Sequence, residues 1–275
     1  MAQKSSYLRF KPRAKPPSIG VDGHSMHNEI LLGLPRKECE AVLEKVELLE
    51  MRTHEVLNEM GEPIGQCYFV NSGLASILTV LSDGKSVEVG LVGKEGFVGL
   101  PLVVGLTTSA TRAVTQIAGT AYRVSAPDLS KLLRTCPQLE KKLNRYSQTF
   151  ALQATQVAAC NRLHEVEERL ARWLLMSQDR IGGDVVPLTQ EFLAHMLGTR
   201  RASVTVAAGI LQKAGLIAYA RGAVKIVHRG NLEDAACECY EILVNQSRNW
   251  KNESAEVGSI RYKRLERTDR QHPRN

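Results

Sequence analysis

The chain has 275 residues, a formal net charge of +7 at pH 7 and an isoelectric point near 9.1. This length suits two domains with tails, and the positive charge favours an anionic partner such as a nucleic acid. No apolar run approaches the length that spans a bilayer, and residues 1–17 are basic and lack the apolar core of a signal peptide. We therefore expect a protein of the cytoplasm that does not interact with a membrane.

The N-terminal part of the sequence predicts a basic arm followed by a β-rich domain. Residues 1–26 combine lysines and arginines with few apolar residues, which is typical of a disordered arm. Two short helices are expected over residues 28–34 and 36–46. The segments that follow are short, β-rich and punctuated by glycine, which predicts a jelly-roll-like β-roll over residues 27–135. Its clearest hairpin joins residues 74–81 to 86–92 through Ser82-Asp83-Gly84, and a helix is expected from Ser125 to Arg134.

A long helix is predicted to begin at Pro137 and to end near residue 163. Its apolar positions recur in steps of three and four, as in a coiled-coil seam of about three heptads. We interpret residues 136–163 as a dimerisation helix whose interface comprises Leu139, Leu143, Tyr146, Phe150 and Val157. The alternative is that this stripe packs on the chain's own β-roll, which is the commoner fate of an amphipathic helix.

Residues 164–245 are predicted to form a winged helix-turn-helix domain. Glu165 can cap a new helix, which begins the core of this domain. Residues 189–208 predict two helices joined by a tight turn at Gly198, with the small residue Ala194 where the helices cross. Residues 216–227 alternate around a turn at residues 221–222, which predicts a hairpin, the wing. An ordinary helical hairpin is the alternative for residues 189–208, and residues 246–275 are predicted to be a disordered basic tail.

The charge of this domain indicates DNA as its partner. Between residues 186 and 230 the only acidic residue is Glu191, whereas the basic residues are Arg200, Arg201, Lys213, Arg221, Lys225 and Arg229. The start of the second helix is the end that enters a major groove in helix-turn-helix proteins. We therefore expect base contacts from the donors that fall there, which are Arg200, Arg201 and Thr205.

A glycine-rich β-roll, a long seam helix and a winged helix-turn-helix in this order resemble the Crp/Fnr family of bacterial transcription regulators. The resemblance covers residues 28–240, and its most specific parts are residues 168–175 and 188–217. It implies an α+β protein with a sensor roll and a DNA-binding output domain. An enzyme is another possibility, but no Ser/His/Asp, metal or phosphate-loop arrangement in the sequence supports it, so we expect no enzymatic activity. The resemblance also implies a homodimer on near-palindromic double-stranded DNA, with RNA polymerase as a further partner. Thr189 and Ser203 match family positions that contact phosphates, and we expect the same of Gln190, Arg221 and Lys225.

The cyclic-nucleotide residues of the family do not carry over to this chain. In members that bind these nucleotides, a Gly-Glu-Leu carboxylate holds the ribose and a downstream arginine holds the cyclic phosphate. The corresponding stretch, residues 96–105, is apolar throughout, and Arg112 lies out of register. We therefore expect that neither cAMP nor cGMP is the effector, which is unknown or absent, and that no cofactor is bound. The alternative is a cyclic-nucleotide-responsive or redox-responsive regulator on the same scaffold.

The six cysteines have neither a disulfide framework nor the N-terminal cluster of iron–sulfur members, so reduced thiols are expected. They are Cys39, Cys67, Cys136, Cys160, Cys237 and Cys239. Cys237 and Cys239 resemble a metal-binding pair, but a single intervening residue is an unfavourable spacing for two ligands of one ion, and no second pair is expected nearby. We therefore predict no metal site. Cys160 is expected to be a buried core thiol, with a redox switch at a dimer axis as the alternative.

Overall fold

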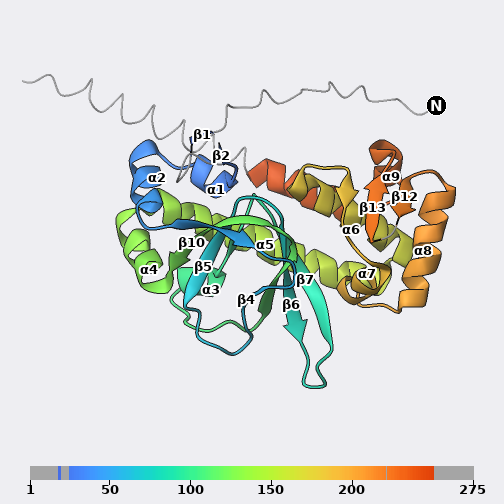
Figure 1. The fold of residues 1–275 in the computed structure, drawn as a ribbon, viewed down its shortest axis with the longest axis horizontal. Helices are drawn as coiled ribbons and strands as arrows, with labels where there is room; N and C mark the ends of the chain where they lie inside the picture. Colours follow the sequence, from blue (N-terminus) through green and yellow to red (C-terminus); the bar gives the residue numbers. More distant parts are fainter. Residues whose placement is uncertain (1–17, 20–24, 221, 251–275) are drawn as a thin grey trace, which may run out of the picture.

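The structure is a computed structural model that describes residues 18–19, 25–220 and 222–250 (Figure 1). A β-roll forms its N-terminal part and a winged helical domain its C-terminal part, and the long helix α5 (Pro137–Leu163) connects the two. This architecture confirms the predicted α+β fold. In the described part of the chain, no helix is both long and apolar enough to cross a membrane.

Two four-stranded antiparallel sheets form the β-roll, in the orders β3-β10-β5-β8 and β4-β9-β6-β7. Side chains from both sheets, such as Phe69, Val92 and Tyr122, pack into one core. The pairing of β6 with β7 confirms the predicted hairpin. The strands are β3 (Glu47–Met51), β4 (Val56–Asn58), β5 (Gln66–Val70), β6 (Leu74–Val80), β7 (Ser86–Val92), β8 (Phe97–Val98), β9 (Arg112–Ile117) and β10 (Gly119–Ser125).

The structure begins earlier than the sequence predicts. Helices α1 (Glu29–Leu32) and α2 (Arg36–Leu43) confirm the two short helices. Strands β1 (Ser18–Ile19) and β2 (Ser25–Met26) pair with each other, and the Met26 side chain is only 2% exposed. The prediction of disorder up to residue 26 is therefore wrong at its end, because burial of the Met26 side chain offsets the cost of ordering its backbone. Residues 1–17 and 20–24 of the predicted arm lie outside the described residues.

Helices α4 (Ala126–Thr135) and α5 follow the roll where they are predicted. The Ser125 hydroxyl caps α4 by accepting a hydrogen bond from the backbone N–H of Asp128 at 3.2 Å. Pro137 occupies the first turn of α5, where the missing N–H costs nothing and the fixed φ favours the helix. These local signals explain why both helix starts are readable from the sequence.

The apolar stripe of α5 packs on the chain's own β-roll, which corrects the predicted dimer interface. Leu139 and Leu143 are fully buried, and Tyr146 lies with them in the core of the roll. Phe150 is half-buried against this core, and Val157 is buried farther along the helix. Since neighbours in the same chain cover these side chains, the stripe is not available to a second copy. Heptad spacing reports that a helix face is buried and does not report what covers it.

The winged domain begins with α6 (Val166–Ile181), where Glu165 and Glu168 form the reciprocal hydrogen bonds of a capping box. Helices α7 (Gln190–Met196) and α8 (Arg201–Lys213) follow, and Gly198 in the turn between them has a φ of 57°. A β-branched or bulky residue would be strained in this left-handed conformation, so the glycine suits the tight turn. The predicted helix-turn-helix geometry is therefore confirmed.

A three-stranded sheet of order β11-β13-β12 completes the wing. Its strands are β11 (Val185–Val186), β12 (Ile217–Ala220) and β13 (Ala223–Ile226), and β12 pairs with β13 as the predicted hairpin. After α9 (Arg229–Asp234), residues 239–250 form a C-terminal helix. The predicted disordered tail from residue 246 is therefore wrong for residues 246–250, since the helix continues through them. Residues 251–275 lie outside the described residues.

Candidate nucleic-acid interface and its contact with the roll

The helix-turn-helix has a small apolar core of its own. Leu193, Ala194 and Val204 are buried between α7 and α8, as their spacing predicts. The Thr189 hydroxyl accepts a hydrogen bond from the backbone N–H of Phe192 at 3.2 Å and so caps α7. This packing fixes the position of α8 against α7 and leaves one face of α8 in solvent.

The exposed face at the start of α8 carries the donors that the sequence places there. Arg200 is the N-cap of α8 and Arg201 is its first residue, and both are exposed. The Thr205 hydroxyl lies 2.9 Å from Gln190 Oε1, so the starts of α7 and α8 meet at this face. An Arg201 nitrogen lies 3.8 Å from a Glu191 oxygen, and these side chains are 68% and 76% exposed. Such an exposed pair contributes little to stability, so a stronger acceptor can displace it.

The remaining predicted phosphate contacts are more scattered. Ser203 is half-buried on α8, and Lys225 is exposed on β13. Arg221, at the turn of the wing, lies outside the described residues. Val206 aligns with a base-reading position of the family but does not retain the family's arginine, and Ile210 was not among the predicted contacts; they are 64% and 46% exposed on α8. Val206 and Ile210 follow Ala202 at intervals of four residues, which places all three side chains on one face of the helix. This spacing is the feature of the sequence that could have identified Val206 and Ile210 as part of the exposed face.

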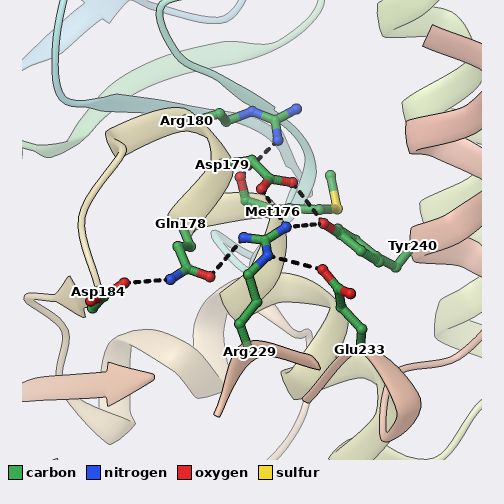
Figure 2. Close-up of polar contacts among 8 residues, drawn as sticks. All are labelled: Met176, Gln178, Asp179, Arg180, Asp184, Arg229, Glu233 and Tyr240. Carbon is green, nitrogen blue, oxygen red and sulfur yellow. Dashed lines mark hydrogen bonds and ion pairs between the residues drawn. The ribbon is translucent and has the colours of Figure 1, made fainter. Parts of the chain in front are cut away.

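Arg229 belongs to an internal network rather than to this exposed face (Figure 2). Its guanidinium lies 2.7 Å from Asp179 and 2.9 Å from Glu233, and it donates to Gln178 at 2.7 Å. Tyr240 donates a hydrogen bond to Asp179 at 2.9 Å and accepts one from Arg229. The network therefore fastens α9 and the C-terminal helix to the end of α6.

The roll touches the helix-turn-helix directly. Ser86, at the start of β7, lies with its hydroxyl 2.6 Å from His195 Nε2 on α7. Deeper in this contact, the Trp173 indole on α6 donates a 2.8 Å hydrogen bond to Glu88 Oε1 on β7. Burial raises the pKa of the Glu88 carboxyl to about 7, although its hydrogen bonds from Ser76 and Trp173 oppose this shift. The roll and the winged domain are therefore joined by direct side-chain contacts.

The stretch that corresponds to a nucleotide-binding segment is short and apolar. Residues 96–105 contain β8, a turn at Gly99 and the helix α3 (Leu100–Val103). Arg112 Nε on β9 donates to both carboxylate oxygens of Glu59, at 2.9 and 3.0 Å. This contact holds the pKa of Glu59 below its usual value. The arginine therefore already has a carboxylate partner in the same chain.

Four metal-ligating side chains meet where α5 ends, which contradicts the expectation of no second pair near Cys237 and Cys239. Cys160 and His164, from the end of α5, lie beside them, and the four ligand atoms are all within 4.8 Å of one another. The spacing of Cys237 and Cys239 in the sequence gives no sign that the fold brings Cys160 and His164 beside them. Cys160 faces its own chain, at 3.4 Å from the Cys237 sulfur, and not a second copy.

Comparisons with known proteins identify both parts of the molecule. A model described as cyclic nucleotide-binding domain matches residues 48–136, and one described as Crp-like helix-turn-helix domain matches residues 168–235. A comparison with curated proteins found no match in sequence. The molecule therefore joins a domain of the cyclic-nucleotide-binding type to a DNA-binding helix-turn-helix.

Solved structures share this arrangement. FixK2 from Bradyrhizobium japonicum is 19% identical with a TM-score of 0.60, over 70% of this chain and 98% of that one. CLP from Xanthomonas campestris, described as a c-di-GMP-responsive global regulator, is 21% identical with a TM-score of 0.58, over 70% and 99%. At sequence identities this low, the similarity to these two structures shows a shared fold and nothing further. One chain therefore carries both domain types in this order, which makes it a transcription regulator of the Crp/Fnr type.

Proposed function

We propose that the protein regulates transcription as a cytoplasmic homodimer that binds a near-palindromic operator and contacts RNA polymerase, without enzymatic activity. The observation that carries the proposal is the exposed start of α8, where Arg200, Arg201 and Thr205 lie on a helix whose other face is packed in the core of the domain. A helix placed in this way presents donors to base edges in a major groove.

Dimerisation through the outer face of α5 supplies the second recognition helix. The exposed positions of this face recur in steps of three and four, at Gln148, Ala151, Thr155, Ala158 and Arg162. Alanine and threonine at the centre of this stripe allow two helices to approach closely. Val104, which is 63% exposed, lines a groove beside Asn144 and Gln148 at one end of the stripe. A partner helix would cover this groove.

The exposed face of α8 also suggests which bases are recognised. Arg201 can donate two parallel hydrogen bonds to guanine, and the apolar side chain of Val206 suits contact with a thymine methyl group. The half-site should therefore contain a guanine read by Arg201 and a thymine read by Val206.

Arg201→Ala is expected to weaken binding to the operator by about 1 to 3 kcal/mol and to relax preference at one base pair per half-site. Duplexes selected from a random library by the wild-type protein provide the operator for mobility-shift titrations at fixed salt. Lys225→Ala serves as the comparison, because loss of a phosphate contact should weaken binding to all sequences alike. Unchanged affinity and selectivity of Arg201→Ala would disprove this placement of the recognition helix.

Millimolar cAMP or cGMP is expected to leave the melting temperature unchanged. Residues 96–105 offer no carboxylate for the ribose, and Arg112 is paired with Glu59. A ligand of the folded state at a hundredfold excess over its Kd would add about 2.7 kcal/mol of stability, which is readily seen in a thermal shift. An upward shift with either nucleotide, or saturable binding in calorimetry, would instead assign the roll a cyclic nucleotide as its effector.

A further inference from the structure

A side-chain cluster at the junction of the two domains has the donor set of a metal site. Cys160 lies in the last turn of α5, and His164 is the residue at which this helix ends. Cys237 lies just before the C-terminal helix, and Cys239 is the first residue of this helix. The two pairs are separated by more than seventy residues, since Cys160 and Cys237 are 77 positions apart. Tertiary folding alone therefore creates the cluster.

The distances in the cluster are close to those of a tetrahedral centre. The Cys160 and Cys237 sulfurs are 3.4 Å apart, and the Cys239 sulfur is 3.5 Å from His164 Nδ1. A zinc ion bound at usual bond lengths places two sulfurs about 3.8 Å apart, and a sulfur and an imidazole nitrogen about 3.6 Å apart. All four ligand atoms lie within 4.8 Å of one another, which is close enough for them to share one ion. They are too close together to bind the separate irons of a cluster.

The surroundings orient the ligands as a metal site requires. His164 turns its other ring nitrogen, Nε2, to Glu238, at 3.1 Å from the carboxylate. A carboxylate that accepts from the outer nitrogen of a ligating histidine fixes the ring with its inner nitrogen toward the metal. The Gln156 amide lies 3.1 Å from the Cys239 sulfur, as a donor to a thiolate would.

The site is buried, and a cation lies near it. Cys160, Cys237 and Cys239 are each at most 5% exposed, and their thiols are not joined in disulfides. The Arg172 guanidinium interacts electrostatically with Cys160, and its Nε has no hydrogen-bond partner among the described residues. Three thiolates and a divalent ion carry a net negative charge, which this arginine would partly offset.

We propose that Cys160, His164, Cys237 and Cys239 bind one zinc ion in a closed, four-ligand structural site. Soft thiolates with one imidazole in tetrahedral geometry favour zinc, and four protein ligands leave no open position for catalysis. The ion joins the end of α5 to the start of the C-terminal helix. It therefore stabilises the segment that connects the long helix to the winged domain.

Metal analysis of the untagged full-length protein tests the site. Protein purified under reducing conditions without chelators should contain about one zinc ion per chain. After removal of the zinc, Co²⁺ should produce the intense visible bands and the sulfur-to-cobalt charge-transfer band of a tetrahedral thiolate centre. Chelation should lower the melting temperature, and added Zn²⁺ should restore it.

Matched variants locate the metal. Cys237→Ser and His164→Ala should lose the zinc, whereas Cys39→Ser, on α2, should retain it. Glu238→Gln keeps all four ligands and should bind zinc about 10- to 100-fold more weakly. If Cys237→Ser does not fold, the cobalt spectrum of the wild-type protein still decides the question. The proposal would be overturned if the wild-type protein bound neither zinc nor cobalt, or if it contained copper or iron with sulfide instead. It would also be overturned if the Cys237→Ser variant kept its zinc.

Discussion

Leu143→Glu is expected to prevent folding and not to produce a folded monomer. Leu143 is fully buried in the core that α5 shares with the β-roll. A carboxylate at this position has no partner there, and its burial costs several kcal/mol, a large part of the net stability of a typical domain. Circular dichroism and thermal unfolding should show loss of the cooperative transition. A folded Leu143→Glu monomer would restore the apolar stripe as the dimer interface.

Ala151→Glu separates dimerisation from folding. Ala151 lies on the exposed stripe of α5, so the single chain tolerates a carboxylate there, whereas two copies would place their charges against each other. We expect a normal melting profile for the monomer, sedimentation as a monomer at micromolar concentration and loss of operator binding. Ala218→Glu makes the same exchange at an exposed position of β12 and should still sediment as a dimer. An Ala151→Glu dimer as tight as wild type would rule out this face.

Glu88→Gln is expected to remove a pH dependence of about 3 kcal/mol from the free energy of unfolding. Burial raises the pKa of Glu88 from 4.5 to about 7, so the folded state binds this proton more tightly than the unfolded state does. The contribution of Glu88 to stability is therefore greatest below pH 4.5. It falls as the pH rises from 4.5 to about 7 and is constant above that range.

The glutamine keeps the size of the side chain and can still accept the hydrogen bond from Trp173. Urea unfolding between pH 5 and pH 8 measures the effect, and the difference between the variant and the wild type cancels the titration of the histidines. The nearby cations, Arg172 and Arg180, lower the pKa of Glu88 but remain charged throughout this range. Glu62→Gln, at an exposed position, is the control. If the free energy of unfolding depended on pH in the same way for Glu88→Gln and the wild type, the raised pKa of Glu88 would be contradicted.

Helix ends, turns and the helix-turn-helix were predictable because their signals are local. Ser125, Thr189 and the Glu165–Glu168 pair cap helices through hydrogen bonds to residues only three positions away in the sequence. Gly198 adopts the positive φ that its turn requires. Periodicity likewise reported correctly which side chains of α7 and α8 are buried. For these features, neighbours in the chain supply most of the free energy that selects the conformation.

Contacts between distant segments could not be predicted in this way. The stripe on α5 has the period of a coiled coil, yet it is the roll that covers it, because burial of apolar surface is not directional and any complementary apolar face satisfies it. Cys160 and His164 likewise carry no local sign of Cys237 and Cys239. Chain order, charge and local pattern predict a DNA-binding regulator and place its candidate reading helix at residues 201–213. The packing of the roll, α5 and the C-terminal helix determines which face is free for a partner and brings four ligands together at one point.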